Sequence, residues 1–433
     1  MNKDKAINVG LIGFGVVGSG VAELFSRNKD SKINLEKIAV KDIKKARKLS
    51  FSALTTDANE ILEDPDIDIV VELIGGYEPA KDYIIKAIRN GKHVVTANKA
   101  VISKFGPEIF AEAAKNKVNI GFEGSVAGGI PIINPLLDQL NLGEIKSING
   151  ILNGTTNFML TRMGEGMDYE SALKIAQEKG FAEADPSFDV DGKDAAQKIS
   201  ILASLAFGKW INPDEIYCEG IKEITPLDID YAKELGYVIK LLATARKTEN
   251  GEIDIRVNPA LISKNHELAS INEEFNAIHI QGVPFDEYFN VGKGAGQGPT
   301  SFSVYYDIIR IADMIRNGSV KEIKVNNKYA KIANADNLLT EGYLRLYLRH
   351  IPGSIHSVLG VLVNNNWNVK DTIQRSGKYE IEAEGIKCLP DIITHEPLPF
   401  GFIKKTLPEL KALKNEHGYP VYGNPFYLRI ERF

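Results

Sequence analysis

The chain has few of the residues that build covalent or metal-bound scaffolds. Its 433 residues include two cysteines and seven histidines. Two cysteines are too few for a disulfide framework or a thiolate metal site, which fits a reducing cytoplasm. The histidines show neither an HExxH motif nor paired spacing, so a transition-metal centre is not expected.

Long apolar runs and a dominant charge are also missing. No uninterrupted apolar stretch could span a bilayer, and the net charge of −5 creates no broad field for polyanions. Neither a membrane nor a nucleic acid is therefore expected as a partner. Glycines interrupt the apolar stretch at residues 3–22, and no cleavage site follows it, so it is not a signal peptide. The composition, 44% apolar and 25% charged, is that of a globular protein, and the length predicts two or three domains.

A glycine-rich turn follows the first predicted strand. Residues 7–12 predict a short buried strand, which leads directly into a GxGxxG turn and a helical pattern. Glycines there permit a tight turn, a close approach to a pyrophosphate and close packing of helix on strand. The helix start would offer free N–H groups to phosphate. A purely structural turn is the alternative. The candidate coenzyme contacts are Gly13, Phe14, Gly15, Val16 and Gly18.

The end of the second predicted strand, residues 35–40, bears on the choice of coenzyme. Lys41 comes first there and Asp42 second. A basic residue at this position can accept the 2′-phosphate of NADP, whereas an acidic one favours the ribose hydroxyl of NAD. The order favours NADP and leaves NAD open. The alternative for Lys41 is a solvated basic turn.

Further strands are predicted at residues 67–74 and 93–96, with helices at 79–90 and 107–117. This alternation predicts an α/β domain of the Rossmann type, with a doubly wound parallel sheet and its ligand across the carboxyl ends of the strands. Gly75 and Lys99 both fall at such ends. They are therefore candidates for contact with ligand.

Asp194 and Lys198 lie four residues apart at the start of a predicted helix, residues 194–207. This spacing places a carboxylate and an ammonium on one helix face. Exposed pairs of this kind contribute about 0.3–0.5 kcal/mol and carry no chemistry, which is the alternative interpretation. The polar loop Asn153-Gly154-Thr155-Thr156-Asn157 precedes them and gathers more unusual polar groups.

Six motifs in one order resemble those of the homoserine dehydrogenase family over residues 7 to about 320. The motifs are Gly13-Phe14-Gly15-Val16-Val17-Gly18, Thr96-Ala97-Asn98-Lys99, residues 122–131 (FEGSVAGGIP), residues 153–158 (NGTTNF), residues 180–186 (GFAEADP) and residues 192–198 (GKDAAQK).

The resemblance implies the reversible NAD(P)H-dependent reduction of L-aspartate 4-semialdehyde to L-homoserine, a step toward threonine and methionine. By position, Lys198 matches the family's proton donor, and Lys99 matches a lysine shared between nicotinamide and substrate. Glu183 and Asp194 match substrate-binding carboxylates, and Gly180 matches a coenzyme contact. The chemistry agrees, because an ammonium can stabilise the developing alkoxide and supply a proton.

The family also holds a sodium ion in a loop that matches Glu123, Val126, Gly128 and Ile130. A glycine-rich turn can aim several carbonyl oxygens at one hard cation. The alternative is a tight connection that needs small residues. Gly124 stands where the family usually has alanine.

The middle of the chain predicts an α+β catalytic and dimerisation domain at residues 131–320, and the resemblance implies a homodimer or homotetramer. A second glycine-rich turn precedes a predicted helix at residues 300–316. The resemblance implies that the chain returns there to the nucleotide-binding domain, residues 1–130, which is completed by about 300–320. The remaining predicted elements are strands at 145–152, 254–261 and 279–283 and helices at 169–179 and 229–249.

The C-terminal part, residues 340–433, resembles an ACT domain, a ferredoxin-like module that senses amino acids. Threonine is the chemically reasonable effector. His350-Ile351 replace the usual acidic residue before the first helix, and a structural or oligomerising role is the alternative. The predicted order is strand 343–349, helix 354–364, strand 367–374, strand 388–395, helix 405–415 and strand 425–431.

Two other functions compete with a homoserine dehydrogenase. The first is a non-catalytic sensor of NAD(P) and amino acids, which would use the same two kinds of domain. The second is a dehydrogenase acting on another small aldehyde or amino acid. The presence of Lys99, Glu183, Asp194 and Lys198 together argues against the sensor, and the order of the motifs argues against the second enzyme.

Overall fold

The computed structural model describes residues 5–28, 32–47, 49, 51–323 and 325–433. Close contacts group the chain into two compact units. The first comprises the chain up to Gly154, residues 194–216 and residues 274–330, and the second comprises residues 155–193, 217–273 and 331–433. Each unit therefore gathers segments that are far apart in the sequence.

A six-stranded parallel sheet forms the nucleotide-binding part of the first unit, in the order β3-β2-β1-β4-β5-β6. This is the order of a doubly wound dinucleotide-binding fold, and it confirms the predicted fold class. The strands are β1 (Ile7–Ile12), β2 (Ile33–Ala39), β3 (Leu54–Thr55), β4 (Ile69–Glu72), β5 (His93–Thr96) and β6 (Ile120–Gly121).

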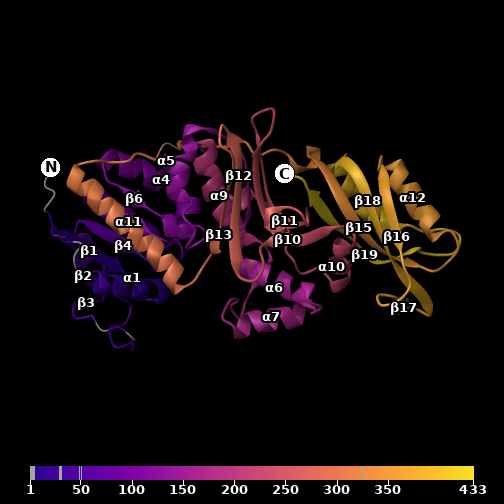
Figure 1. The fold of residues 1–433 in the computed structure, drawn as a ribbon, viewed down its shortest axis with the longest axis horizontal. Helices are drawn as coiled ribbons and strands as arrows, with labels where there is room; N and C mark the ends of the chain where they lie inside the picture. The colour runs from indigo at the N-terminus through magenta and orange to yellow at the C-terminus, as the bar shows by residue number, and fades with distance from the viewer. Residues whose placement is uncertain (1–4, 29–31, 48, 50, 324) are drawn as a thin grey trace. The chain divides into compact units, whose positions relative to one another are not determined.

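Helices α1 (Val16–Arg27) and α11 (Gln297–Asn317) lie against this sheet (Figure 1). Val304, Ile308 and Ile311 of α11 are fully buried in one core with apolar residues of β1, β2 and β4. The chain thus returns to its N-terminal sheet only after all the elements between β6 and α11. The sheet's remaining helices are α2 (Asn59–Leu62), α3 (Ala80–Arg89) and α4 (Lys99–Asn116).

Helix α4 begins eight residues before the predicted start at residue 107, so the prediction was wrong there. Pro107 lies inside the helix and removes the N–H that would bond the Ser103 carbonyl. The indole Nε1 of Trp210 donates to that carbonyl instead, at 3.2 Å. Gly106 leaves room for the indole, because a Cβ at this position would collide with its ring. A tertiary contact therefore compensates for the proline.

The rest of the first unit contains three antiparallel strands, β7 (Glu144–Ile151), β12 (Phe275–Val283) and β13 (Asp286–Lys293). Helix α9 (Lys193–Phe207) is buried along most of its length, from Asp194 to Leu205. Two short helical segments, η1 (Glu123–Ser125) and α5 (Ile133–Asp138), follow β6. The short strands β8 (Lys209–Trp210) and β14 (Asn326–Tyr329) pair with each other.

The second unit corrects the prediction of a helix at residues 229–249. Helix α10 (Pro226–Glu234) ends early, Gly236 adopts φ +82°, and Tyr237–Lys247 form strand β10. This strand pairs along its whole length with β11 (Ile253–Ser263). Residues 239–245 are buried on both faces, so their burial has no period that distinguishes a helix from a strand. Pairing with β11 determines that they form a strand. The other helices of this part are α6 (Gly154–Gly164), α7 (Tyr169–Glu178) and α8 (Ser187–Val190).

The C-terminal part has the predicted βαββαβ order, with one additional short strand, β17, between the second and third of the predicted strands. Its strands neighbour one another in the antiparallel order β19-β15-β18-β16, which is ferredoxin-like. Val358, Leu362, Ile403 and Leu410 of the two helices share a core with the sheet. The elements are β15 (Leu339–Arg349), α12 (Ser354–Asn364), β16 (Val369–Gln374), the short β17 (Ile381–Ala383), β18 (Ile386–Pro399), α13 (Phe400–Ala412) and β19 (Val421–Glu431).

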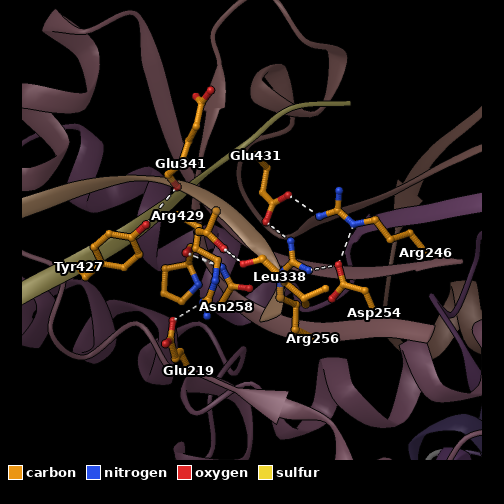
Figure 2. Close-up of polar contacts among 12 residues, drawn as sticks. Glu219, Arg246, Asp254, Arg256, Asn258, Leu338, Glu341, Tyr427, Arg429 and Glu431 are labelled. Carbon is orange, nitrogen blue, oxygen red and sulfur yellow. Dashed lines mark hydrogen bonds and ion pairs between the residues drawn. The ribbon is translucent and has the colours of Figure 1, made fainter. Parts of the chain in front are cut away.

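Strand β19 also pairs in parallel with β11, so the C-terminal module shares its last strand with the neighbouring sheet. Figure 2 shows the ion pairs that accompany this pairing. Glu431 accepts from Arg256 at 2.5 Å and from Arg246 at 3.0 Å, and Asp254 binds both arginines in turn. Arg256, Asp254 and Glu431 are buried. The C-terminus is therefore built into this unit.

Candidate active site

The predicted pyrophosphate turn has the geometry that the glycines suggest. Gly13 adopts φ +107°, and a Cβ at Gly18 would collide with the Gly13 carbonyl. Helix α1 begins at Val16, which is 67% exposed, and no side chain caps its start. A Cβ on Gly15 would meet open space. The first N–H groups of α1 are thus open to a diphosphate.

The structure adds a basic residue to the coenzyme end of β2. Lys41 is exposed directly after the strand. The Arg47 guanidinium lies 5.7 Å from the centroid of the Phe14 ring and donates to the Asp42 carbonyl at 2.7 Å. The carboxylate of Asp42 accepts from the Lys44 N–H at 2.8 Å and thereby stabilises the turn in which Asp42 lies. Arg47 was not among the residues predicted from the sequence.

The carboxyl ends of β4 and β5 carry the turn and the lysine that the sequence placed there. Gly75 and Gly76 both adopt left-handed backbone, with φ +76° and +71°. Asn98 caps helix α4, since its Oδ1 accepts from the Val101 N–H at 3.3 Å. Lys99 is consequently the first residue of a helix and not part of a free turn.

Asp194 lies between two ammonium groups. Its Oδ2 accepts from Lys198 Nζ at 2.7 Å, and its Oδ1 lies 3.2 Å from Lys99 Nζ. The Asn153 side chain donates to Oδ2 at 2.9 Å. Lys198 also donates to the Leu152 carbonyl at 2.7 Å. Three of the four residues expected to act on substrate are thereby brought together, and Asn153 is an addition that the polar loop had signalled.

Burial and charge act in opposite directions on this carboxylate. Removal from water favours the neutral acid, but the charges of Lys198 and Lys99 outweigh it and lower the pKa of Asp194 to about 2. The side chain of Lys198 is 10% exposed, whereas that of Lys99 is 32% exposed. The cluster thus combines a buried anion, a buried cation and a second cation that solvent or ligand can reach.

Glu183 and Gly180 belong to the second unit and follow helix α7. Gly180 is exposed with φ +73°, a conformation that favours glycine. Glu183 is exposed, and its backbone carbonyl accepts from Gln177 Nε2 at 3.1 Å.

The proposed sodium loop has an unusual backbone. Ala127 and Gly128 adopt left-handed conformations in succession, with φ +51° and +39°. The Gly128 carbonyl accepts from the Ser303 hydroxyl at 2.7 Å, which leaves it one further lone pair. No group of three or more His, Cys, Asp or Glu side chains suited to a metal occurs in the described part of the chain. Backbone carbonyls, including those of Val126 and Ile130, are therefore what this loop can offer a cation.

The carboxylate of Glu123 is occupied by the start of α5. It accepts from the N–H groups of Ile132, Ile133 and Asn134 at 2.5–2.8 Å and from the Asn134 side chain at 2.5 Å. The neighbouring Asp307 accepts from the Glu123 N–H at 2.8 Å, and burial raises its pKa to about 6. The Glu123 carboxylate therefore holds the loop in place through hydrogen bonds to residues 132–134, and it lies beside the loop carbonyls.

Two protein-family models match most of this chain. The model of the NAD-binding domain of homoserine dehydrogenase matches residues 13–123, and the homoserine dehydrogenase model matches residues 131–309. The homoserine dehydrogenase of Synechocystis is 43% identical over 94% of this chain and 96% of its own length. That of Bacillus subtilis is 37% identical over 97% and 99%. The chain belongs to the homoserine dehydrogenase family.

Solved structures of homoserine dehydrogenases agree. A crystal structure from Thiobacillus denitrificans has a TM-score of 0.89 at 35% identity and covers 99% of this chain and 98% of its own. A hyperthermophilic archaeal homoserine dehydrogenase in complex with NADPH has a TM-score of 0.59 at 27% identity, over 71% and 97%. The archaeal enzyme's own length thus corresponds to about seven tenths of this chain.

Membership of the homoserine dehydrogenase family makes the chain a nicotinamide-dependent oxidoreductase acting on a small molecule, with L-aspartate 4-semialdehyde and L-homoserine as its reactants. A non-catalytic sensor is set aside on this ground. Among the helices that the structure describes, none has the length and apolar character needed to cross a membrane.

Proposed function

We propose that Lys198 exchanges a proton with the oxygen that is an aldehyde in one reactant and a hydroxyl in the other. The observation that carries this proposal is the Asp194 carboxylate held between Lys198 and Lys99. The bound nicotinamide supplies or accepts the hydride. In the reducing direction, negative charge grows on the substrate oxygen. An ammonium beside it stabilises that charge and then gives up a proton.

The neighbouring residues hold this lysine in place. Asp194 and the Leu152 carbonyl both accept from Lys198 Nζ at 2.7 Å, which fixes the direction of the ammonium. Lys99, the more exposed cation, is available to both substrate and nicotinamide. Glu183 is exposed and acidic, which suits it to the substrate's α-ammonium, and Gly180 is a backbone contact for coenzyme.

We propose NADP as the preferred coenzyme. The residues assigned to the coenzyme lie at or next to the start of α1, namely Gly13, Phe14, Gly15, Val16 and Gly18, or follow the end of β4, namely Gly75. Lys41 and Arg47 lie on the loop after β2 and supply positive charge for a 2′-phosphate. The Asp42 carboxylate is already bonded to its own turn, which weakens the case for NAD.

Three further proposals concern support and regulation. A sodium ion would be held by the carbonyls of Glu123, Val126, Gly128 and Ile130, with the Glu123 charge nearby. The C-terminal ACT-like module would bind threonine as effector, with His350-Ile351 in place of the usual acidic residue before its first helix. The enzyme would be a cytoplasmic homodimer or homotetramer organised as nucleotide-binding, catalytic and regulatory domains.

A substrate and coenzyme panel tests the proposal. Oxidation of homoserine, malate and glutamate is followed by absorbance of the reduced nicotinamide, with NADP⁺ and NAD⁺, each with and without threonine. Turnover of homoserine alone, faster with NADP⁺, is expected, together with inhibition by threonine. Equal rates with both coenzymes would remove the preference for NADP, and rates unchanged by threonine would remove the effector. Replacing Glu183 by Gln should raise KM for homoserine; an unchanged KM would contradict its contact with the α-ammonium.

A further inference from the structure

Glu72, the last residue of β4, is an acid buried at the coenzyme end of an otherwise apolar strand. Its side chain has no exposed surface. One carboxylate oxygen accepts from the N–H groups of Ile74 and Gly75, at 2.8 and 3.3 Å, and the other accepts from the Thr96 hydroxyl at 2.7 Å. Burial raises the pKa of Glu72, and these hydrogen bonds favour its ionised form. The carboxylate therefore joins the turn after β4 to the end of β5.

The hydrogen bonds continue into a closed ring. Glu72 and Thr96 face each other in the register of β4 and β5. The Thr96 hydroxyl oxygen accepts from the Asn98 N–H at 3.0 Å, and the Asn98 side chain donates to the Gly76 carbonyl at 2.8 Å. Gly76 follows Gly75, whose N–H returns to Glu72. The ring thus ties the glycine turn to the N-cap of α4.

Lys99 is the residue directly after this ring, and its ammonium lies 3.2 Å from Asp194. A shift of the N-cap would move the start of α4 and with it the lysine. We propose that Glu72 is a positioning residue that couples the glycine turn at Gly75–Gly76, where coenzyme binds, to Lys99 at the substrate. The proposal rests on the function proposed above for Lys99.

Stability of the sheet alone gives no reason for an acid here. Ile69, Val70 and Val71 precede Glu72 and are fully buried apolar residues. Burying a carboxylate costs free energy unless several donors compensate, and an apolar side chain would avoid that cost. The carboxyl ends of parallel strands are where ligands bind in such sheets. A fixed turn and a fixed lysine on adjacent strands are what hydride transfer between two bound molecules requires.

Substitution of Thr96, whose hydroxyl joins Glu72 to Asn98, tests this coupling most directly. Thr96→Val keeps the shape and removes the hydroxyl, whereas Thr96→Ser keeps the hydroxyl. For wild type and each variant, the test measures kcat, KM for homoserine, Kd for NADPH from NADPH fluorescence, and the melting temperature. Thr96→Val should lower kcat/KM for homoserine about tenfold or more, and Thr96→Ser should restore it to within about threefold. Glu72→Gln should weaken NADPH binding as well as turnover. A lower melting temperature with kcat, KM and Kd all within twofold of wild type would overturn the proposal.

A double mutant separates this proposal from the one on which it rests. If Glu72 and Thr96 act through Lys99, Thr96→Val should add little to the loss already caused by Lys99→Ala. Full additivity of the two losses would overturn the coupling while leaving the role of Lys99 intact. Unchanged turnover in Lys99→Ala alone would instead remove the proposed role of the lysine and the coupling with it.

Discussion

Asp194 and Lys198 form a buried ion pair at 2.7 Å, one turn apart on α9, and the same carboxylate lies 3.2 Å from Lys99. The spacing alone is that of an ordinary exposed helix pair. Burial makes the pair energetically more important than an exposed one, because removing one partner would leave a charge in a low-dielectric site. The pair is thus suited to holding an ammonium in a fixed direction next to a reacting oxygen.

Replacement of Lys198 by Ala should lower kcat by about 10²–10⁴-fold, because the group that transfers the proton is lost. Binding of NADPH should remain within threefold of wild type in a fluorescence titration. Lys209→Ala, an exposed lysine just beyond the same helix, is the control and should retain full activity. Wild-type turnover in Lys198→Ala would remove the proposed mechanism.

Replacement of Asp194 by Asn should change how stability depends on pH. The folded pKa of about 2 lies below the ordinary value of 3.8. The ionised carboxylate therefore stabilises the fold above about pH 4, and this contribution is lost as pH falls toward 2. The difference in unfolding free energy between wild type and variant should shrink by about 2 kcal/mol between pH 6 and pH 2. Urea unfolding measures it, and a constant difference would contradict the low pKa.

Replacement of Arg47 or Lys41 by Ala should weaken NADPH more than NADH. A contact with the 2′-phosphate is a charged hydrogen bond, so each loss should raise Kd for NADPH about tenfold. Lys44→Ala, an exposed lysine of the same loop, serves as the control. Equal losses for both coenzymes would show that the residue contributes only surface charge.

Replacement of Glu431 by Gln should destabilise the protein by about 3 kcal/mol, because Arg256 would keep only Asp254 as a counter-charge in a buried site. Glu382→Gln, an exposed acid on β17, is the control and should cost less than about 0.5 kcal/mol. Urea unfolding at constant pH gives both values. Equal stability of the two variants would mean that the ion pairs of Glu431 with Arg246 and Arg256 in Figure 2 contribute nothing net.

Exchange of sodium for choline in the buffer tests the proposed cation loop. Binding to the folded state alone raises stability with ion concentration. The melting temperature should therefore rise with sodium chloride more than with choline chloride at equal ionic strength. Identical curves would leave the left-handed backbone at Ala127 and Gly128 as a structural turn only.

Prediction from sequence succeeded where local patterns suffice. The GxGxxG turn requires glycine at Gly13 for its left-handed backbone and at Gly18 for lack of space. The motif itself predicted both requirements, because all its residues lie within six positions. Helix 354–364 was predicted with the bounds that α12 has. The failures were non-local. Residues 237–247 became a strand through pairing with β11, and Pro107 was accommodated through Trp210.

The candidate site divides in the same way. Lys99, Asp194 and Lys198 could be chosen from their motifs and Asn153 from the polar loop, whereas Arg47 and Glu72 were recognised only from their contacts. The contacts that single them out, Phe14 for Arg47 and Thr96 for Glu72, are distant in sequence, and no local spacing encodes such pairs.

The amino-acid order by itself determined the nucleotide-binding turn, the alternation of strands and helices, and which charged residues were available for chemistry, since each depends on neighbours within a few positions. Only the tertiary structure decided that Asp194 is buried between two lysines and that an acid at the end of β4 reaches across to Thr96. Burial and cross-strand contact arise when distant segments pack together, and they change the energy of a charge far more than its sequence neighbours do.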